Sequence, residues 1–170
     1  YSEPLIITRA EGKRIFEIDG KTAFEAYRDR IDELTVENFN EVGMKHPFGF
    51  TALNGYYFIR DPFVLNNENG SIDCVTEVPN NAIGNIMQGD ISSLIKTAEE
   101  VTKKAAANIT EPMFALVCDC ISRYLLMGDK FELELQAVSN AFEDDIPIIG
   151  VLTFGEIGTL SDIPFFHNKT

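Results

Sequence analysis

The order of apolar and polar residues predicts mostly short strands in the first half of the chain. Residues 14–18 alternate as a strand does, and the Asp19-Gly20 pair after them is a turn signal. Phe24, Tyr27 and Ile31 recur at helical spacing and predict a short helix. After it we expect a turn of helix opened by Thr35, a Gly- and Pro-rich loop over residues 43–49, and strands over residues 56–60, 63–65, 71–77 and 81–87.

The second half predicts longer helices and apolar strands. Asp90 is expected to cap a long amphipathic helix, and a second such helix is expected over residues 130–142. The apolar residues of 113–120 and 146–157 predict buried strands, and Phe165 is expected to begin another. Helices and strands mix without strict alternation. The prediction is therefore an α+β fold with one antiparallel or mixed sheet and helices mainly on one face, like PAS or profilin folds in general layout.

Composition and charge exclude several classes of partner. The 170 residues suffice for one domain, and 27 acidic against 14 basic residues make a formal net charge of −13. This charge argues against nucleic acid and against an anionic membrane surface, both of which attract clustered basic residues. No apolar run is long enough to span a bilayer, and no signal peptide pattern opens the chain. Since the chain begins without Met, we expect a single domain excised from a longer protein.

The three cysteines raise the possibility of a thiol or metal site. An odd number without spaced pairs indicates a reducing compartment, and hence the cytoplasm. On a strand, Cys118 and Cys120 would face the same side, where His167 or Cys74 would have to complete a zinc site. The alternative, which we favour, is that the thiols pack as small apolar groups. A Cys120–His167 catalytic pair is also conceivable, but no recognised nucleophile or phosphate-binding motif is present, so we do not expect an enzyme.

Two charged residues at predicted strand ends are candidate binding groups. Arg123 follows the strand that ends near Cys120, where it would either clamp a ligand carboxylate or pair with an acid such as Glu132 or Glu134. Glu156 lies between glycines at the end of another strand. It would accept a hydrogen bond from a ligand, pair with Arg123 or Arg60, or face solvent.

Four motifs together resemble the C-terminal half of a FIST domain, the F-box and intracellular signal transduction sensory domain. The resemblance is specific over residues 115–170 and looser upstream, where Tyr57-Phe-Ile-Arg60 is similar to a middle strand of the family. Ser122 stands where the family often has Gly. The motifs are Cys120-Ile-Ser-Arg123, Glu132-Leu-Glu134-Leu135, Thr153-Phe-Gly155-Glu156-Ile157 and His167-Asn168-Lys-Thr170.

The resemblance implies a sensory input domain over residues 1–170 that binds a small molecule, amino acids among the candidates. The implied partner is an output domain such as a histidine kinase or chemoreceptor, as in two-component systems, and a homodimer is compatible with that role. No catalytic residue, metal or cofactor is implied. An interaction or structural module without a ligand is the alternative, and a thiol or zinc site is a third hypothesis. The expected ligand-binding residues are Arg123, Glu156, His167, Asn168, Cys120 and Arg60.

Overall fold

The computed structural model divides the chain into two compact units. Unit 1 consists of residues 1–88 and 155–170, and unit 2 of residues 89–154. The structure describes residues 2–51, 55, 57–107, 109–142, 146–160 and 163–167, with side chains described as far as Ile157. The expectation that residues 1–170 form a single domain remains a prediction.

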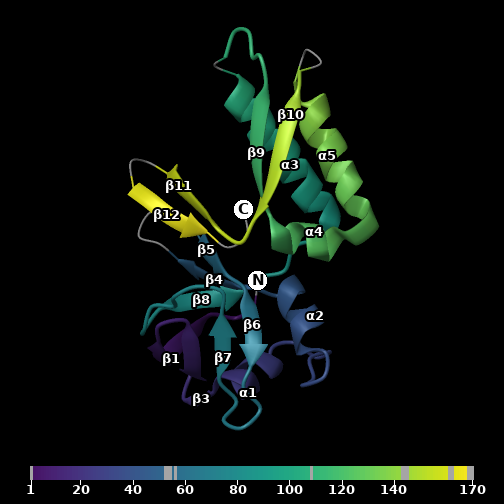
Figure 1. Cartoon of the computed structure of the whole chain (residues 1–170). Helices are drawn as coiled ribbons and strands as arrows, with labels where there is room; N and C mark the ends of the chain where they lie inside the picture. The colour runs from purple at the N-terminus through teal and green to yellow at the C-terminus, as the bar shows by residue number, and fades with distance from the viewer. Residues whose placement is uncertain are drawn as a thin grey trace. The chain divides into compact units, whose positions relative to one another are not determined.

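Unit 1 is built on an antiparallel sheet in the order β5-β4-β8-β1-β2-β7-β6, with β3 paired to β2 (Figure 1). Leu5 and Ile7 of β1 are two residues apart and both buried, as alternation predicts. Ile15 and Ile18 of β2 are three apart and also both buried, and the β1–β2 register is irregular between the positions where they pair. The strands are β1 (Leu5–Glu11), β2 (Arg14–Ile18), β3 (Lys21–Thr22), β4 (Phe48–Thr51), β5 (Tyr57–Arg60), β6 (Pro62–Leu65), β7 (Ile72–Cys74) and β8 (Ile83–Ile86).

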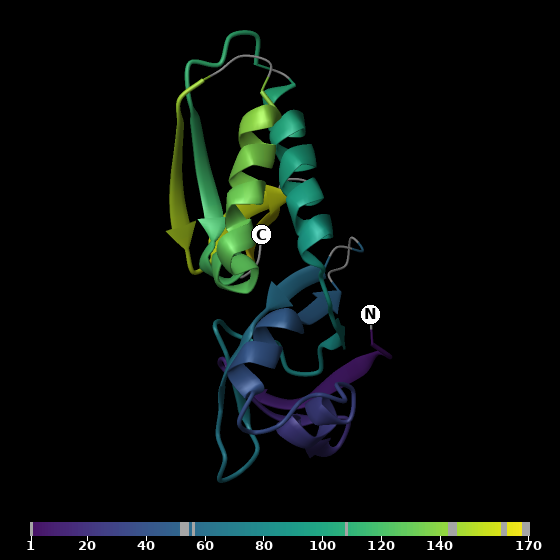
Figure 2. The ribbon, with the colours of Figure 1, turned by 90° about the vertical axis from the view of Figure 1, so that its right-hand side faces the viewer.

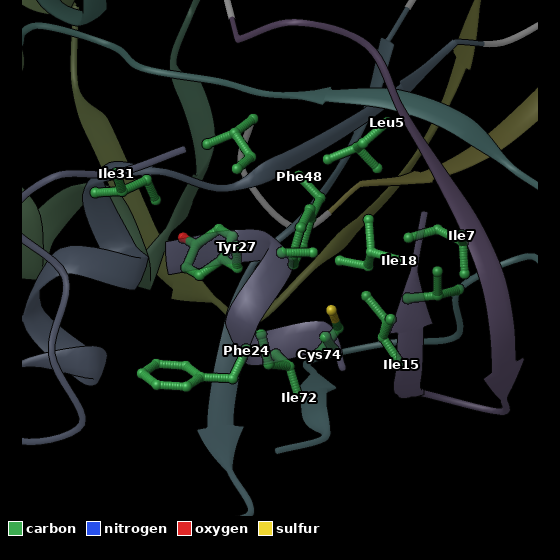
Figure 3. Close-up of a cluster of buried hydrophobic side chains, with 14 of the residues drawn as sticks. Leu5, Ile7, Ile15, Ile18, Phe24, Tyr27, Ile31, Phe48, Ile72 and Cys74 are labelled. Carbon is green, nitrogen blue, oxygen red and sulfur yellow. The ribbon is translucent and has the colours of Figure 1, made fainter. Parts of the chain in front are cut away.

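Two short helices, α1 (Ala23–Arg28) and α2 (Phe39–Lys45), complete the core of unit 1. Tyr27 of α1 is fully buried beside the ring of Phe48, with 5.0 Å between ring centroids. Its hydroxyl donates to the carbonyl of His46 at 2.5 Å, which satisfies the one polar atom of the side chain. Figure 3 shows Tyr27 and Phe48 among the aliphatic side chains of the sheet. The core of unit 1 therefore combines aromatic rings with the aliphatic side chains of the sheet.

The end of the chain returns to unit 1 as a hairpin. Strand β11 (Glu156–Leu160) pairs antiparallel with β12 (Ile163–His167), and β12 also contacts β5. Glu156 lies directly opposite His167 in the register of this pair. The hairpin therefore places two of the expected binding residues side by side along the backbone.

Unit 2 is a parallel strand pair backed by helices. Strands β9 (Ala115–Cys120) and β10 (Ile148–Thr153) pair in parallel, and the connection between them carries α4 (Ile121–Met127), a 3-10 turn, η1 (Gly128–Lys130), and α5 (Phe131–Asn140). Such a helical crossover is what parallel strands require. Helix α3 (Ile91–Ala106) packs against α5, and both lie on the same side of the strand pair (Figure 2).

The predicted fold class is confirmed, because the structure has helices and a mainly antiparallel sheet. The predicted cap is also present: the carboxylate of Asp90 accepts a hydrogen bond from the Ser93 backbone at 3.0 Å. The strands form one large sheet and two separate pairs rather than one sheet. The apolar run of 146–157 is divided between units, since β10 ends at Thr153 and β11 begins at Glu156.

The prediction of a loop over residues 43–49 was wrong. Helix α2 continues to Lys45, and β4 begins at Phe48. The glycines in this stretch serve close packing rather than a turn: a Cβ on Gly43 would meet Pro62 at 3.2 Å, and one on Gly49 would meet Met87 at 2.6 Å. Glycine composition alone does not distinguish these two uses.

The predicted burial of the strands in unit 2 was also wrong. Leu116 of β9 and Ile149 of β10 are opposite each other on the face away from α5, and they are 63% and 59% exposed. Parallel strands are usually covered on both faces, which is why continuous apolar runs favoured burial. In the described chain the helices of unit 2 cover one face only.

Gly84 is the glycine whose replacement should damage unit 1 most. An added Cβ would lie 2.5 Å from the backbone carbonyl of Gly49 and 2.7 Å from the Phe50 ring, and neither can move without disturbing β4. We expect Gly84→Ala to lower the free energy of unfolding by about 1–3 kcal/mol, as overpacking does. Urea unfolding followed by circular dichroism measures the change. Gly150→Ala, also on a strand but with open space around the Cβ, is the control; equal losses in the two variants would contradict the packing argument.

Candidate ligand-binding site

The end of β9 brings Arg123 into the interior of unit 2. Helix α4 begins at Ile121, directly after the last residue of β9, so Arg123 lies in the first turn of this helix. Its side chain is only 5% exposed. A guanidinium buried this deeply needs carboxylate and carbonyl partners, because an unpaired buried charge is very costly.

Glu134 of α5 is the main partner of Arg123. The Arg123 Nε donates to Glu134 Oε1 at 3.1 Å, and Nη2 donates to Oε2 of the same carboxylate. The Glu134 side chain is 1% exposed. This bidentate geometry is among the strongest forms of ion pair that arginine makes. Nη2 also donates to the carbonyl of Leu94 in α3 at 3.0 Å, so three helices meet at one guanidinium.

Asp119 of β9 is a second carboxylate beside this pair. Its Oδ1 lies 3.5 Å from Arg123 Nε and accepts a hydrogen bond from the backbone N–H of Cys120 at 2.7 Å. Burial, helped by the neighbouring negative charge of Glu134, raises the pKa of Asp119 to about 6, although Arg123 acts in the opposite direction. The carboxyl group of Asp119 therefore changes charge near pH 6.

The strand pair and α5 enclose a pocket of about 540 Å³ within unit 2. Asp119 is the one charged residue among its described lining residues, and Ser139 adds a hydroxyl. The rest of the lining is apolar apart from the backbone at Gly150, a composition typical of small-molecule sites. The lining residues are Val117, Asp119, Phe131, Leu135, Val138, Ser139, Ile146, Ile148, Gly150, Val151 and Leu152.

The residues expected from the sequence to bind a ligand fall into two sets. Arg123 and Cys120 belong to unit 2, where Cys120 is fully buried at the end of β9. Arg60, Glu156 and His167 belong to unit 1, and Asn168 lies outside the described residues. The side chain of His167 is likewise outside what the structure describes. Whether these residues bind a ligand remains a prediction.

Arg60 has structural partners within unit 1. Its Nε donates to the carbonyl of Glu77 at 2.7 Å and Nη1 donates to that of Ile59 at 2.8 Å. The guanidinium also lies 5.0 Å from the ring centroid of Phe58. These contacts of Arg60 support a structural role for it in addition to any role in binding. Glu156, the other charged candidate of unit 1, is half-buried at the start of β11.

Sequence reasoning missed the pocket and the part that Asp119 plays in it. A single acid within an apolar strand was a signal, because alternation places Asp119 on the opposite face from Cys118. Glu134 was one of two acids proposed as partners of Arg123, and helical spacing distinguishes them. Glu134 follows Phe131 by three residues and precedes Val138 by four, on the inward stripe, whereas Glu132 is exposed.

The thiol and metal hypothesis receives no geometric support. Within the described residues, no three His, Cys, Asp or Glu side chains come together as a metal site would require. Cys118 is exposed and Cys120 buried, although both lie on β9. In the same part of the chain, no helix has the length and apolar character needed to cross a bilayer.

The Arg123–Glu134 pair should respond very differently to single and double substitution. Glu134→Leu alone leaves the buried guanidinium with one carboxylate at longer range, so we expect a loss of about 3–5 kcal/mol in the free energy of unfolding. Arg123→Met combined with Glu134→Leu removes both charges and should restore most of that loss. Urea unfolding followed by helical circular dichroism measures this, with the exposed Glu132→Leu as control. A double variant as unstable as the sum of its single variants would contradict the pairing.

Asp119 should make the stability of the protein depend on pH. The folded pKa of about 6 is above the ordinary 3.8, so the folded state binds more protons than the unfolded state between these values. Stability contributed by protonated Asp119 is present at low pH and lost as the pH rises through about 6. Relative to Asp119→Asn, the native protein should lose on the order of 1–3 kcal/mol between about pH 4 and pH 7.5. Urea unfolding across this range tests it, with the exposed Asp129→Asn as control; parallel curves for native protein and Asp119→Asn would contradict it.

Comparison with known proteins identifies the family of the chain. The model of the FIST C domain family matches residues 23–159, which is more than half of the chain and includes residues of both units. A protein of Methanocaldococcus jannaschii, described as uncharacterized protein MJ1623, is 25% identical over 189 aligned residues. The alignment covers 96% of this chain and 36% of that protein, so the chain spans about a third of its relative. No solved structure matches the chain. The extent of the family match shows that the chain belongs to the FIST C domain family, a family of sensory domains in signal transduction.

Proposed function

We propose that this chain is a sensory input module that binds a small molecule in the pocket between β9, β10 and α5. The observation that carries the proposal is the position of Asp119. This side chain lines an apolar pocket of about 540 Å³ and also lies 3.5 Å from the buried Arg123 guanidinium. Pockets of roughly 300–1,000 Å³ with few polar groups are typical of small-molecule sites. The proposal includes no catalytic step.

The hydrogen bonds of Arg123 supply a route by which a bound ligand acts on the fold. A ligand that changes the charge or position of Asp119 alters the field at Arg123, which holds α4 to the Leu94 carbonyl of α3 and to Glu134 of α5. A ligand shifts a conformational equilibrium only through different affinities for the two states. A change at this guanidinium would produce such a difference, because three helices depend on its contacts. We propose that the helices transmit this conformational change to an output domain such as a histidine kinase or chemoreceptor.

An amino-acid ligand, with Arg123 receiving its carboxylate, is the finer hypothesis from the sequence. In that case the ligand would have to replace Glu134 at a guanidinium that already makes three hydrogen bonds. The binding roles of Glu156, His167, Asn168 and Arg60, which belong to unit 1, are a separate proposal. Arg123→Ala tests the amino-acid hypothesis through a ligand affinity rather than through stability.

A second candidate function is contact with another protein domain. The observation in its favour is the face of the strand pair opposite α5, where Leu116 and Ile149 lie opposite each other and are exposed. Single exposed apolar residues are ordinary, but paired ones on an uncovered sheet face favour a contact surface. In this case the Arg123–Glu134 pair would serve folding alone, and no small molecule would bind beside Asp119.

A thermal-shift screen of small metabolites distinguishes the two functions. We expect at least one compound to raise the melting temperature by several degrees when present at about 100 times its dissociation constant, which adds about 2.7 kcal/mol. Gly150→Ile should abolish the shift, because a side chain at this position enters open space in the pocket and suits a strand.

Cys118→Ile is the matched control for the blocked pocket. It adds a similar side chain to the exposed, opposite face of the strand pair and should leave the shift unchanged. If no compound gives a shift that Gly150→Ile removes, the pocket is not a binding site, and the contact function is favoured.

A further inference from the structure

We infer that the pocket takes a ligand with an ammonium head group and an apolar body, and not a carboxylate. The inference rests on the proposed function, because it names the chemical class of the ligand for the same site. It follows from the charges around Asp119, the geometry of Arg123 and the composition of the lining.

Two carboxylates share one cation at this site. Glu134 accepts two hydrogen bonds from Arg123, whereas Asp119 has only the longer 3.5 Å contact with the same guanidinium. Asp119 also accepts a hydrogen bond from the backbone N–H of Cys120. The cluster therefore carries one negative charge in excess when Asp119 is ionised, and Asp119 is the member that lines the pocket.

Apart from Arg123, which lies beside Asp119, no cationic side chain comes near the pocket from its described lining residues. Strand β10 has no charged residue between Ile148 and Thr153, and the residues of α5 that line the pocket are uncharged. From α3 the nearby group is the Leu94 carbonyl, which already accepts from Arg123. Asp129 and Lys130 of the 3-10 turn are exposed and do not line the pocket.

The shape of this charge distribution selects the head group of the ligand. An ammonium group beside Asp119 would supply the missing positive charge, and the largely apolar lining leaves it few other polar partners. A carboxylate there would add a third negative charge to one guanidinium, or would require Glu134 to give up its two hydrogen bonds. The apolar walls, Phe131 and Leu135 on one side and Ile148 and Leu152 on the other, favour an aliphatic or aromatic body.

The pH dependence of binding should follow from the same contact. Because an ammonium binds the ionised form of Asp119 best, affinity should rise as the pH increases through about 6, where this carboxyl loses its proton. Glu134 and Arg123 are the other charged groups that face Asp119, and they remain paired with each other. A neutral ligand of the same shape should not show this rise.

Three probes of nearly equal size test the inference by titration calorimetry on the whole chain. They are phenethylamine, 2-phenylethanol and 3-phenylpropionate, which differ mainly in the head group. We expect phenethylamine to bind at least about tenfold more tightly than the alcohol at about pH 7.5, a difference of about 1.4 kcal/mol. The carboxylate should bind most weakly. Asp119→Asn should remove the advantage of the amine, while the exposed Asp129→Asn should keep it.

The outcomes separate this inference from the proposed function. If 3-phenylpropionate binds as well as phenethylamine, if the amine does not bind, or if Asp119→Asn leaves its affinity unchanged, the ligand class is wrong. Should Gly150→Ile still abolish the binding of another probe or screened compound, the pocket remains a ligand site of different specificity. A screen in which no shift depends on Gly150 overturns both.

Discussion

The helices of unit 2 converge on a single buried guanidinium, and this contact constrains the rest of the unit. Arg123 binds Glu134 through two hydrogen bonds and the Leu94 carbonyl through a third, so α4, α5 and α3 have one shared point of attachment. Removing two charges from water costs several kcal/mol each, and well-packed apolar residues often serve stability as well. A buried pair of this kind is therefore better understood as a determinant of how the helices are placed. It also makes the helix positions sensitive to any further charge beside Arg123.

Asp119 is that further charge, and when it is ionised the group of Arg123, Glu134 and Asp119 carries one excess negative charge beside the pocket. With Glu134 occupying the fork of the guanidinium, Asp119 is left with one longer ionic contact and a backbone hydrogen bond. Burial then raises its pKa to about 6, so small changes in its surroundings decide whether it is charged. Perturbed carboxyl groups in clefts are frequent at functional sites because they respond to ligands at neutral pH. The pair that joins the helices therefore also leaves Asp119 as the carboxylate that faces the pocket.

The two units bury their apolar residues in different ways. Unit 1 has an antiparallel sheet with an interior cluster that includes Tyr27 and Phe48, and strands such as β1 contribute buried residues to it while others face solvent. Unit 2 has a parallel pair with helices on one face and apolar side chains such as Leu116 and Ile149 on the other. Parallel strands rarely remain open in this way. The match to the FIST C domain family includes residues of both units. The sheet of unit 1 and the strand pair of unit 2 therefore both contribute to the region that the family model matches.

The sequence by itself determined the features that depend on near neighbours. The periods of its apolar residues indicated the α+β class, the helix that Asp90 caps and most strands of unit 1, and four short motifs identified the family. Helical spacing also places Glu134, and not Glu132, on the inward side of α5, and so indicates which acid pairs with Arg123. Only the tertiary structure decided that Gly43 and Gly49 allow close packing rather than a turn. It also decided that Asp119 and Gly150 line the same pocket. The reason is physical: periodicity reports which face of an element is apolar, whereas burial, a raised pKa and a pocket depend on which distant elements meet that face.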